Sequence, residues 1–123
     1  MIFEREDFPV LLEKSIGCSV PDQWGFYVSI MLDRFVYLQE TRPEYKDLRV
    51  IQIKEKFGGL RVYCDGADEY INGHISMTAI LCHTTCVTCG SHEDVVNSYE
   101  TPDGYWLSPR CKLHRQETND ENN

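Results

Sequence analysis

The chain has 123 residues, of which 41% are hydrophobic, and a formal net charge of −8. Its length suits one small domain, and the apolar content can bury a modest core, which excludes a fully disordered chain. The acidic charge argues against general DNA binding, because the summed field repels phosphates. No apolar run approaches the roughly 18 residues that a membrane helix needs, so no membrane association is expected.

The first third of the sequence predicts two helices. Residues 8–16 are typical of a short helix that ends at Gly17. Apolar residues at helical spacing predict a second helix within residues 20–43. In this helix Trp24 and Tyr27 could form a ligand-stacking pair, but aromatic residues at this spacing are more typical of a core.

Residues 49–64 change to the two-residue period of β-strands. Two β-rich runs meet at Gly58-Gly59, and this dipeptide supplies the positive φ angles of a tight hairpin turn. If the two glycines form the turn, Lys56 faces Arg61 across the strands. One face of this antiparallel hairpin is then apolar and the other basic.

The basic face consists of the candidate binding residues Lys54, Lys56, Arg61 and Tyr63. Two cations that face each other across strands destabilise a sheet by about 0.2–1 kcal/mol unless an anion relieves the repulsion. The face is therefore either an anion-binding or partner-docking surface, or a solvated strand face whose lysines protect an edge from aggregation or which pairs with carboxylates of the same chain. The second interpretation is favoured because the chain is rich in carboxylates.

A further helix is predicted after the turn at residues 65–68, and it extends to about Cys82. We expect it to pack on the apolar face of the hairpin. His74 on this helix is interpreted as a packing residue rather than as a base or ligand. Cys18 and Cys64 are interpreted as small core residues unless their thiols are exposed and acidic.

The last third of the chain contains two short ligand pairs, Cys86-x-x-Cys89 and Cys111-x-x-His114. Two such pairs separated by a returning loop are typical of a tetrahedral Zn²⁺ site. Four protein ligands leave no open coordination position for water or substrate. The sequence therefore predicts a structural zinc ion and no catalytic residue.

The fourth zinc ligand has rivals to His114. Two symmetric pairs close a tetrahedron with less loop strain than three ligands from one segment, which favours His114. The rivals are Cys82, His83 and His92.

Residues 95–99 and 105–107 predict a second hairpin between the two ligand pairs, and Cys111 and His114 are expected in the first turn of a terminal helix. A zinc knuckle at Cys86-x-x-Cys89, a hairpin, and two ligands at the start of a helix are the parts of a treble-clef or zinc-ribbon element. The predicted fold class is α+β, with N-terminal helices, a central antiparallel β-hairpin with a packing helix, and this C-terminal element.

Three segments are predicted along the chain. Residues 1–84 form the α+β core, residues 85–115 form a zinc-binding element packed on that core, and residues 116–123 form a disordered tail. No secretory signal is recognised at the N-terminus, and paired cysteines are expected to stay reduced. The predicted location is therefore the cytoplasm.

The string IQIKEKFGGLRVY at residues 51–63, followed by an amphipathic helix and the two ligand pairs, resembles a family of small, uncharacterised bacteriophage and prophage proteins. The resemblance covers residues 20–115. It implies a phage origin, a host-cytoplasmic location and a metal-binding end. Such sequences often carry a second Cys-x-x-Cys pair, and Cys111-x-x-His114 preserves zinc chemistry while changing the ligand charge.

Three function classes follow. The favoured one is a protein-interaction module that engages a host or phage protein and modulates or inhibits host or defence machinery. The alternative is a nucleic-acid-binding accessory protein that uses the basic face, with Tyr63 as a stacking residue. A treble-clef nuclease-like enzyme comes third, because residues 92–94 are more typical of a polar loop than of a catalytic site. The sequence leaves the oligomeric state open.

Overall fold

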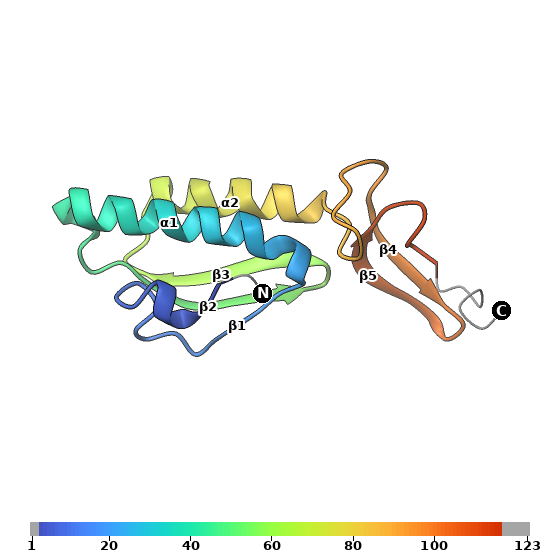
Figure 1. Cartoon of the computed structure of the whole chain (residues 1–123), viewed down its shortest axis with the longest axis horizontal. Helices are drawn as coiled ribbons and strands as arrows, with labels where there is room; N and C mark the ends of the chain where they lie inside the picture. Colours follow the sequence, from blue (N-terminus) through green and yellow to red (C-terminus); the bar gives the residue numbers. More distant parts are fainter. Residues whose placement is uncertain (1–2, 117–123) are drawn as a thin grey trace.

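The computed structural model describes residues 3–116 and confirms the predicted α+β class. Figure 1 shows two long helices lying over one sheet, with a second, smaller sheet beyond the end of the helices. The helices are α1 (Gly25–Thr41) and α2 (Glu69–His83), and the strands are β1 (Gly17–Ser19), β2 (Arg49–Lys56), β3 (Gly59–Asp65), β4 (Val96–Thr101) and β5 (Gly104–Arg110). Three short 3-10 helices are η1 (Arg5–Asp7), η2 (Asp22–Trp24) and η3 (Pro43–Tyr45).

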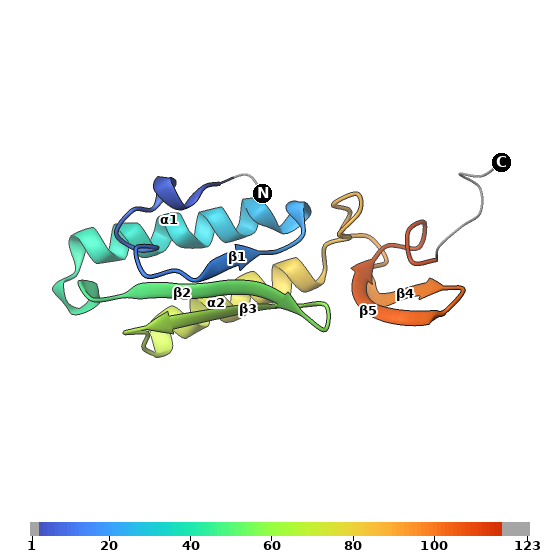
Figure 2. The same cartoon turned by 90° about the horizontal axis from the view of Figure 1, so that it is seen from below.

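The first sheet has the strand order β1-β2-β3. The predicted hairpin is confirmed as the antiparallel pair β2 and β3. Strand β1 was not predicted; it runs parallel to β2, with Gly17 opposite Gln52 and Ser19 opposite Lys54. From below, Figure 2 shows the three strands side by side, with the helices behind them.

The predicted hairpin turn was wrong by one residue. The turn is Phe57-Gly58, since Lys56 pairs with Gly59, and φ is 55° at Phe57 and 81° at Gly58. Positive φ at both central residues matches the type I′ turn, whose twist suits a two-residue hairpin. A bulky residue rarely adopts this conformation, which is why the sequence favoured Gly58-Gly59. The side chain of Glu55 supports the turn by accepting a 2.7 Å hydrogen bond from the Gly58 amide.

The corrected turn changes the cross-strand pairs of the basic face. Arg61 lies opposite Lys54 rather than Lys56, and Tyr63 lies opposite Gln52. Two cations still oppose each other, but they are a different pair. The separation into a basic and an apolar face survives, because the corrected register keeps all four candidate residues on one side of the strands.

Both long helices begin and end near their predicted bounds. The Asp68 carboxylate caps α2 by accepting a 2.9 Å hydrogen bond from the Ile71 amide. The two helices cover the same face of the first sheet (Figure 1), as predicted for α2. Trp24 is 0% exposed, which confirms its place in the core. Around it are the large, fully buried side chains Leu11, Val28, Leu32, Phe35, Leu38, Leu48, Val50, Ile53 and Ile71.

The helix predicted over residues 8–16 was wrong, because this segment forms a series of turns. The carbonyl groups that would continue a helix are already occupied. The Leu11 carbonyl accepts a 3.0 Å hydrogen bond from the Val50 amide of β2. The Arg5 guanidinium donates to the carbonyls of Leu12 and Glu13, at 3.1 and 2.7 Å. These bonds limit the segment to turns, of which one is closed by the 2.9 Å bond from the Leu12 amide to the Phe8 carbonyl.

The second sheet consists of β4 and β5 and confirms the predicted second hairpin. The terminal helix expected at Cys111 is absent from the described residues, which form a turn closed by a 3.0 Å bond from the His114 amide to the Cys111 carbonyl. The reason lies in the next residue: the Arg115 carbonyl accepts a 2.7 Å hydrogen bond from Glu100 of β4, which pulls the chain against the sheet.

Several contacts join the second sheet and its loops to the core. The Asn97 side chain of β4 donates to the Phe57 carbonyl at 3.0 Å, and Tyr27 Oη of α1 lies 2.6 Å from His92 Nε2. The predicted division at residue 84 stays a prediction, and most of the predicted tail, residues 117–123, lies outside the described residues. Within residues 3–116, no helix has the length and apolar character needed to cross a membrane.

Candidate metal centre

The first ligand pair lies in a tight turn that begins just after α2. The Gly90 amide donates to the Cys86 carbonyl and the Cys86 amide donates to the Ser91 carbonyl, both at 2.8 Å. Gly90 has φ of 80°, and a Cβ atom there would lie 2.7 Å from the Gln23 side-chain oxygen. Glycine thus allows both the left-handed backbone and the close approach of η2. The turn places the Cys86 and Cys89 thiols side by side.

The second ligand pair follows β5. The turn from Cys111 to His114 brings the imidazole back over the first pair, with His114 Nδ1 lying 3.2 Å from Cys111 Sγ and 3.7 Å from Cys86 Sγ. The Sγ atoms of Cys89 and Cys111 are 3.8 Å apart. One donor atom from each of the four residues lies within 4.8 Å of the others.

These four side chains could hold a metal ion. Cys86 and Cys111 are buried, His114 is half-buried and Cys89 is exposed, so the cluster sits at the surface of the C-terminal part with its sulfurs partly shielded. The cysteines of the described chain form no disulfide, which leaves the three thiols available as ligands. The arrangement uses four protein donors, the number of a closed tetrahedral site.

The Cys86 thiol is electrostatically prepared to bind a cation. Burial by itself raises its pKa, but backbone amides of Cys111, Cys89 and Thr88 donate toward its sulfur and lower the pKa overall, to about 6. A thiol with this pKa is mostly thiolate at neutral pH, and thiolate is the form that binds metals.

The rival ligands lie elsewhere. Cys82 is fully buried in the apolar core, and burial raises its pKa to about 12. His83 Nδ1 is 3.3 Å from the Gly58 carbonyl oxygen at the hairpin turn. His92 lies between Tyr27 and the Thr85 hydroxyl, at 2.6 and 3.4 Å. Within residues 3–116, none of the three rivals joins the four-residue cluster.

Two arginine side chains connect the loops that carry the ligands. Arg115 donates to the Asp94 carbonyl at 2.7 Å and forms a 3.1 Å ion pair with the Asp94 carboxylate. Arg110 donates to the Thr88 hydroxyl at 2.9 Å, and its guanidinium lies 3.9 Å from the centre of the Tyr99 ring. Arg110 thus holds the first ligand loop against the second sheet, and Arg115 joins the second ligand turn to the loop that leads into β4.

The candidate binding residues of the basic face lie on the first sheet, away from the metal-ligand cluster. Within residues 3–116, no carboxylate forms an ion pair with Lys54, Lys56 or Arg61. Lys54 Nζ lies 5.6 Å from the centre of the Tyr63 ring, and Lys56 Nζ lies 5.6 Å from that of Phe57. The expected pairing of these cations with carboxylates of the same chain was therefore wrong for the described residues, and the alternative of a solvated, edge-protecting face stays a prediction.

The other residues considered from the sequence have structural surroundings. His74 Nδ1 lies 2.9 Å from the Tyr70 carbonyl oxygen, and its ring contacts Phe35. Burial raises the pKa of Cys18 and of Cys64 to about 11, so neither thiol is acidic. This agrees with their interpretation as packing residues.

Sequence reasoning missed a cleft between the tip of the first hairpin and β5. It has a volume of about 800 Å³, and its walls come from η2, the Phe57-Gly58 turn, the turn after Cys86 and residues 105–110 of β5. Three aromatic side chains of its walls are largely exposed: Phe57 at 65%, Tyr105 at 69% and Trp106 at 65%. The signal in the sequence was the Tyr-Trp-Leu run of β5, which predicted a strand but not an exposed surface.

Comparison of the chain with protein-family models, with curated proteins and with solved structures gives no match. The functional conclusion therefore depends on the residues and their geometry.

Proposed function

We propose that this chain is a small protein-interaction module whose C-terminal part is stabilised by a structural Zn²⁺ ion held by Cys86, Cys89, Cys111 and His114. The observation that carries the metal assignment is the convergence of these four donors. A tetrahedral zinc ion with Zn–S bonds of about 2.3 Å places two sulfur ligands about 3.8 Å apart. The Sγ atoms of Cys89 and Cys111 have this separation, 3.8 Å.

The role of this zinc ion is structural. Three thiolates and one imidazole fill its coordination sphere, so no position is left for a substrate or an activated water. Soft thiolate ligands select zinc over Mg²⁺ or Ca²⁺, which prefer oxygen. The ion would join the turn after α2 to the end of β5, two segments that otherwise meet through few buried side chains.

Exposed aromatic residues support the interaction role. Soluble monomers rarely gather several large apolar side chains in one exposed place unless they bind something there. Phe57, Tyr105 and Trp106 do so around the cleft, and aromatic residues are the commonest anchors of protein interfaces. The resemblance to phage proteins extends this proposal: the partner would be a host or phage protein in the host cytoplasm, where reduced cysteines can bind zinc.

Native mass spectrometry tests the zinc assignment. The expected mass is that of the chain plus one zinc ion, and Cys89→Ser should lose that ion while Cys64→Ser keeps it. A wild-type chain purified in zinc-containing buffer that carries no metal would refute the assignment.

An affinity pull-down tests the interaction role, with nuclease-treated and untreated halves of the same lysate. We expect a stoichiometric protein that survives nuclease and is lost with Trp106→Ala. If Trp106→Ala captured the partner as well as the wild type does, the binding surface would lie elsewhere than the cleft.

Nucleic-acid binding is the second candidate, because the basic face lacks carboxylate partners among the described residues. In this candidate Lys54, Lys56 and Arg61 contact phosphates and Tyr63 stacks on a base. Fluorescence anisotropy with a labelled oligothymidylate tests it. Salt-sensitive binding that Lys56→Glu combined with Arg61→Glu abolishes would support it, and absence of binding at low salt would reject it.

A further inference from the structure

The outer edge of β5 (Gly104–Arg110) is open toward its tip. The second sheet has only two strands, so one edge of β5 has no neighbouring strand, and Figure 1 shows β5 on the side nearer to the core. Among the described residues, the backbone hydrogen bond on this edge is the one from the Val87 amide to the Pro109 carbonyl, at 3.0 Å. The strand toward its tip is unpaired on this side.

The pairing with β4 shows which backbone groups point outward. In an antiparallel ladder, pairs alternate between those that bond each other and those that face away. Glu100 pairs with Tyr105, yet its amide donates outward to the Arg115 carbonyl at 2.7 Å. This pair therefore faces away from the ladder, and the Tyr105 N–H and C=O groups are directed to the outer edge of β5.

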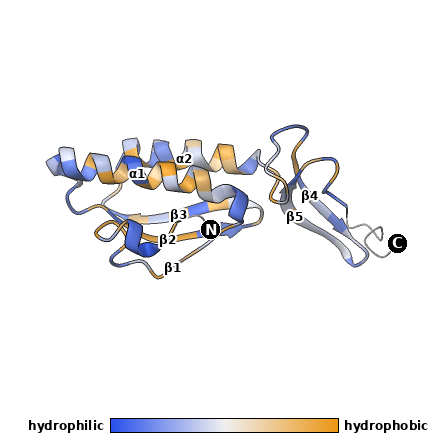
Figure 3. Ribbon diagram, in the orientation of Figure 1, coloured by the Kyte–Doolittle hydropathy of each residue, from blue (hydrophilic) through white to orange (hydrophobic). Residues whose placement is uncertain are grey.

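Natural proteins normally protect such an edge with charged residues. The edge strand of the first sheet, β3, carries Arg61 in its middle. The corresponding part of β5 carries Tyr105, Trp106 and Leu107, which are 69%, 65% and 46% exposed. Because these side chains are exposed, burial in a core does not account for this run, and in Figure 3 the ribbon of β5 is mostly pale rather than strongly hydrophobic.

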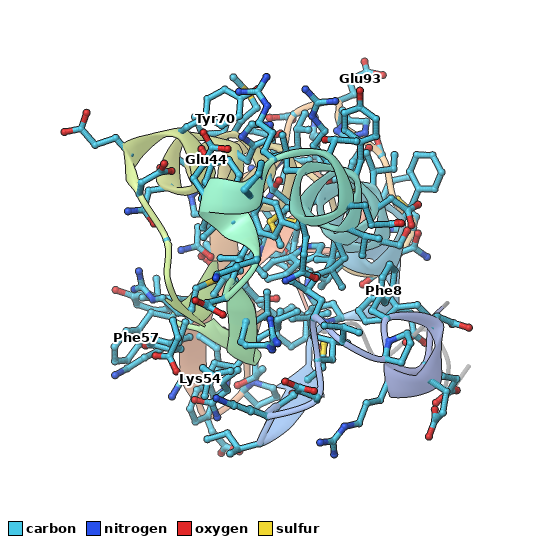
Figure 4. The ribbon with its side chains drawn as sticks, turned by 90° about the vertical axis from the view of Figure 1, so that its left-hand side faces the viewer. Phe8, Glu44, Lys54, Phe57, Tyr70 and Glu93 are labelled. Carbon is cyan, nitrogen blue, oxygen red and sulfur yellow. The ribbon has the colours of Figure 1, made fainter. Side chains whose placement is uncertain are left out.

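The opposite wall of the cleft contains a residue that folding alone does not explain. Phe57 occupies a left-handed backbone position, with φ of 55°, that Asn or Gly would adopt at lower cost. Its ring is 65% exposed and therefore adds little to the core. In Figure 4 the labelled Phe57 and Lys54 lie at the sheet side of the molecule, away from the helix that carries Tyr70. An exposed aromatic ring is thus held at the cleft at the expense of backbone strain.

The charges around the cleft restrict its occupant. Its charged lining residues are Asp22, Glu55 and Arg110, so carboxylates outnumber cations there. Glu55 also accepts from the Gly58 amide, and Arg110 is stacked on Tyr99 and bonded to Thr88. The chain as a whole has a net charge of −8. These carboxylates disfavour a nucleic-acid phosphate backbone and a second copy of the chain, and they favour a positively charged segment.

From these observations we infer that the cleft binds an extended, positively charged segment of a partner protein, which adds as a strand to the free edge of β5. Main-chain hydrogen bonds to Tyr105 and its neighbours supply affinity, and Phe57 and Trp106 contact apolar side chains at alternate positions of the segment. The inference rests on the proposed function and names the class of partner and the way it binds.

Selection from a library of random peptides of about ten residues tests this inference with the full, zinc-loaded chain. We expect the selected peptides to alternate apolar and cationic residues. Their binding would be measured by quenching of the fluorescence of the exposed Trp106. A library without a binder below about 100 μM, or with acidic binders, would overturn the inference.

N-methylation of the selected peptide provides the matched control. In an added strand every second amide faces β5, so methylating that set should weaken binding about tenfold or more, and methylating the other set should change it little. Equal effects of the two sets would exclude strand addition. Tyr105→Pro, which removes an outward N–H, should weaken binding more than Tyr105→Ala does.

Two outcomes separate this inference from the proposals above it. If the pull-down captures a nuclease-resistant partner but the selected peptide tolerates both sets of N-methylation, strand addition is rejected and the interaction module is retained. An oligothymidylate that displaces the peptide in a salt-sensitive way would assign the cleft to nucleic acid and contradict the inference.

Discussion

The core and the C-terminal part of the chain keep their shape by different means. Between the helices and the first sheet, large apolar side chains such as Trp24 and Phe35 are completely enclosed. Within residues 85–116 the buried residues are small: Thr85, Cys86, Pro109 and Cys111. Removal of apolar surface from water stabilises the first region. The second region buries too little for that and depends on metal coordination, as small domains often do.

The largest expected effect comes from removing one metal ligand. Cys89→Ser should abolish tight zinc binding and unfold residues 86–116, because a structural zinc site contributes on the order of 10–16 kcal/mol of binding free energy to folding. The core should keep its helices. A ¹H–¹⁵N NMR spectrum would show this as loss of dispersed peaks from the C-terminal part alone. Cys64→Ser is the control, and an unchanged spectrum and metal content in Cys89→Ser would refute the account.

A cavity in the core should have the next largest effect, and it should destabilise the core rather than the C-terminal part. Leu32 is fully buried, so Leu32→Ala should lower the free energy of unfolding of the core by about 2–5 kcal/mol. Urea denaturation followed by circular dichroism measures it. Leu113→Ala changes a residue that is 82% exposed and should have almost no effect. If Leu32→Ala and Leu113→Ala lowered the free energy of unfolding by similar amounts, apolar burial would not be what stabilises the core in particular.

The helix cap should give a smaller effect that depends on pH. The Ile71 amide and then the Tyr45 hydroxyl hold the pKa of Asp68 below its ordinary value of 3.8. Because the pKa is depressed in the folded state, this stabilisation is present above pH 4 or so and is lost as the pH falls through the folded pKa. Asp68→Ala should therefore lower Tm at neutral pH, and the difference from wild type should disappear in strong acid.

Asp68→Asn separates the cap from the charge. Asparagine keeps a capping oxygen but does not titrate, so its Tm should not follow the same pH dependence. If the difference between Asp68→Ala and wild type stayed constant down to strong acid, the carboxylate would have no part in the stability.

The smallest predicted effect is a gain. Phe57→Asn places Asn-Gly in a type I′ turn, which is the preferred sequence there, and should stabilise the hairpin by about 1 kcal/mol. Thermal unfolding would measure the increase, with Phe57→Ala as the control that keeps most of the backbone strain. A lower Tm for the asparagine variant would show that the exposed ring contributes to folding after all.

Local patterns in the sequence predicted most elements correctly. Helical periodicity identified α1 and α2, strand periodicity identified both hairpins, and ligand spacing indicated the four residues of the cluster. These features depend on neighbouring residues or on a distinctive chemical pair. The four-residue cluster was foreseen because Cys-x-x-Cys and Cys-x-x-His each form within one turn of chain.

The remaining features depend on contacts between distant residues. Strand β1 has three residues and exists because it pairs with β2, more than thirty positions along the chain. Hydrogen bonds from Val50 and Arg5 replaced the helix expected at residues 8–16. The turn was misplaced because Phe57 accepts a conformation that few bulky residues adopt. The cleft arises only when β5 and the hairpin tip come together.

The central claim is that zinc holds the C-terminal part while burial holds the core. Hydrogen–deuterium exchange of the zinc-loaded chain, before and after a chelator, tests it most directly. The account predicts that chelation accelerates exchange in residues 86–116 and leaves the amides of α1, α2, β2 and β3 nearly as protected as before. Uniform acceleration along the chain, or none at all, would contradict it.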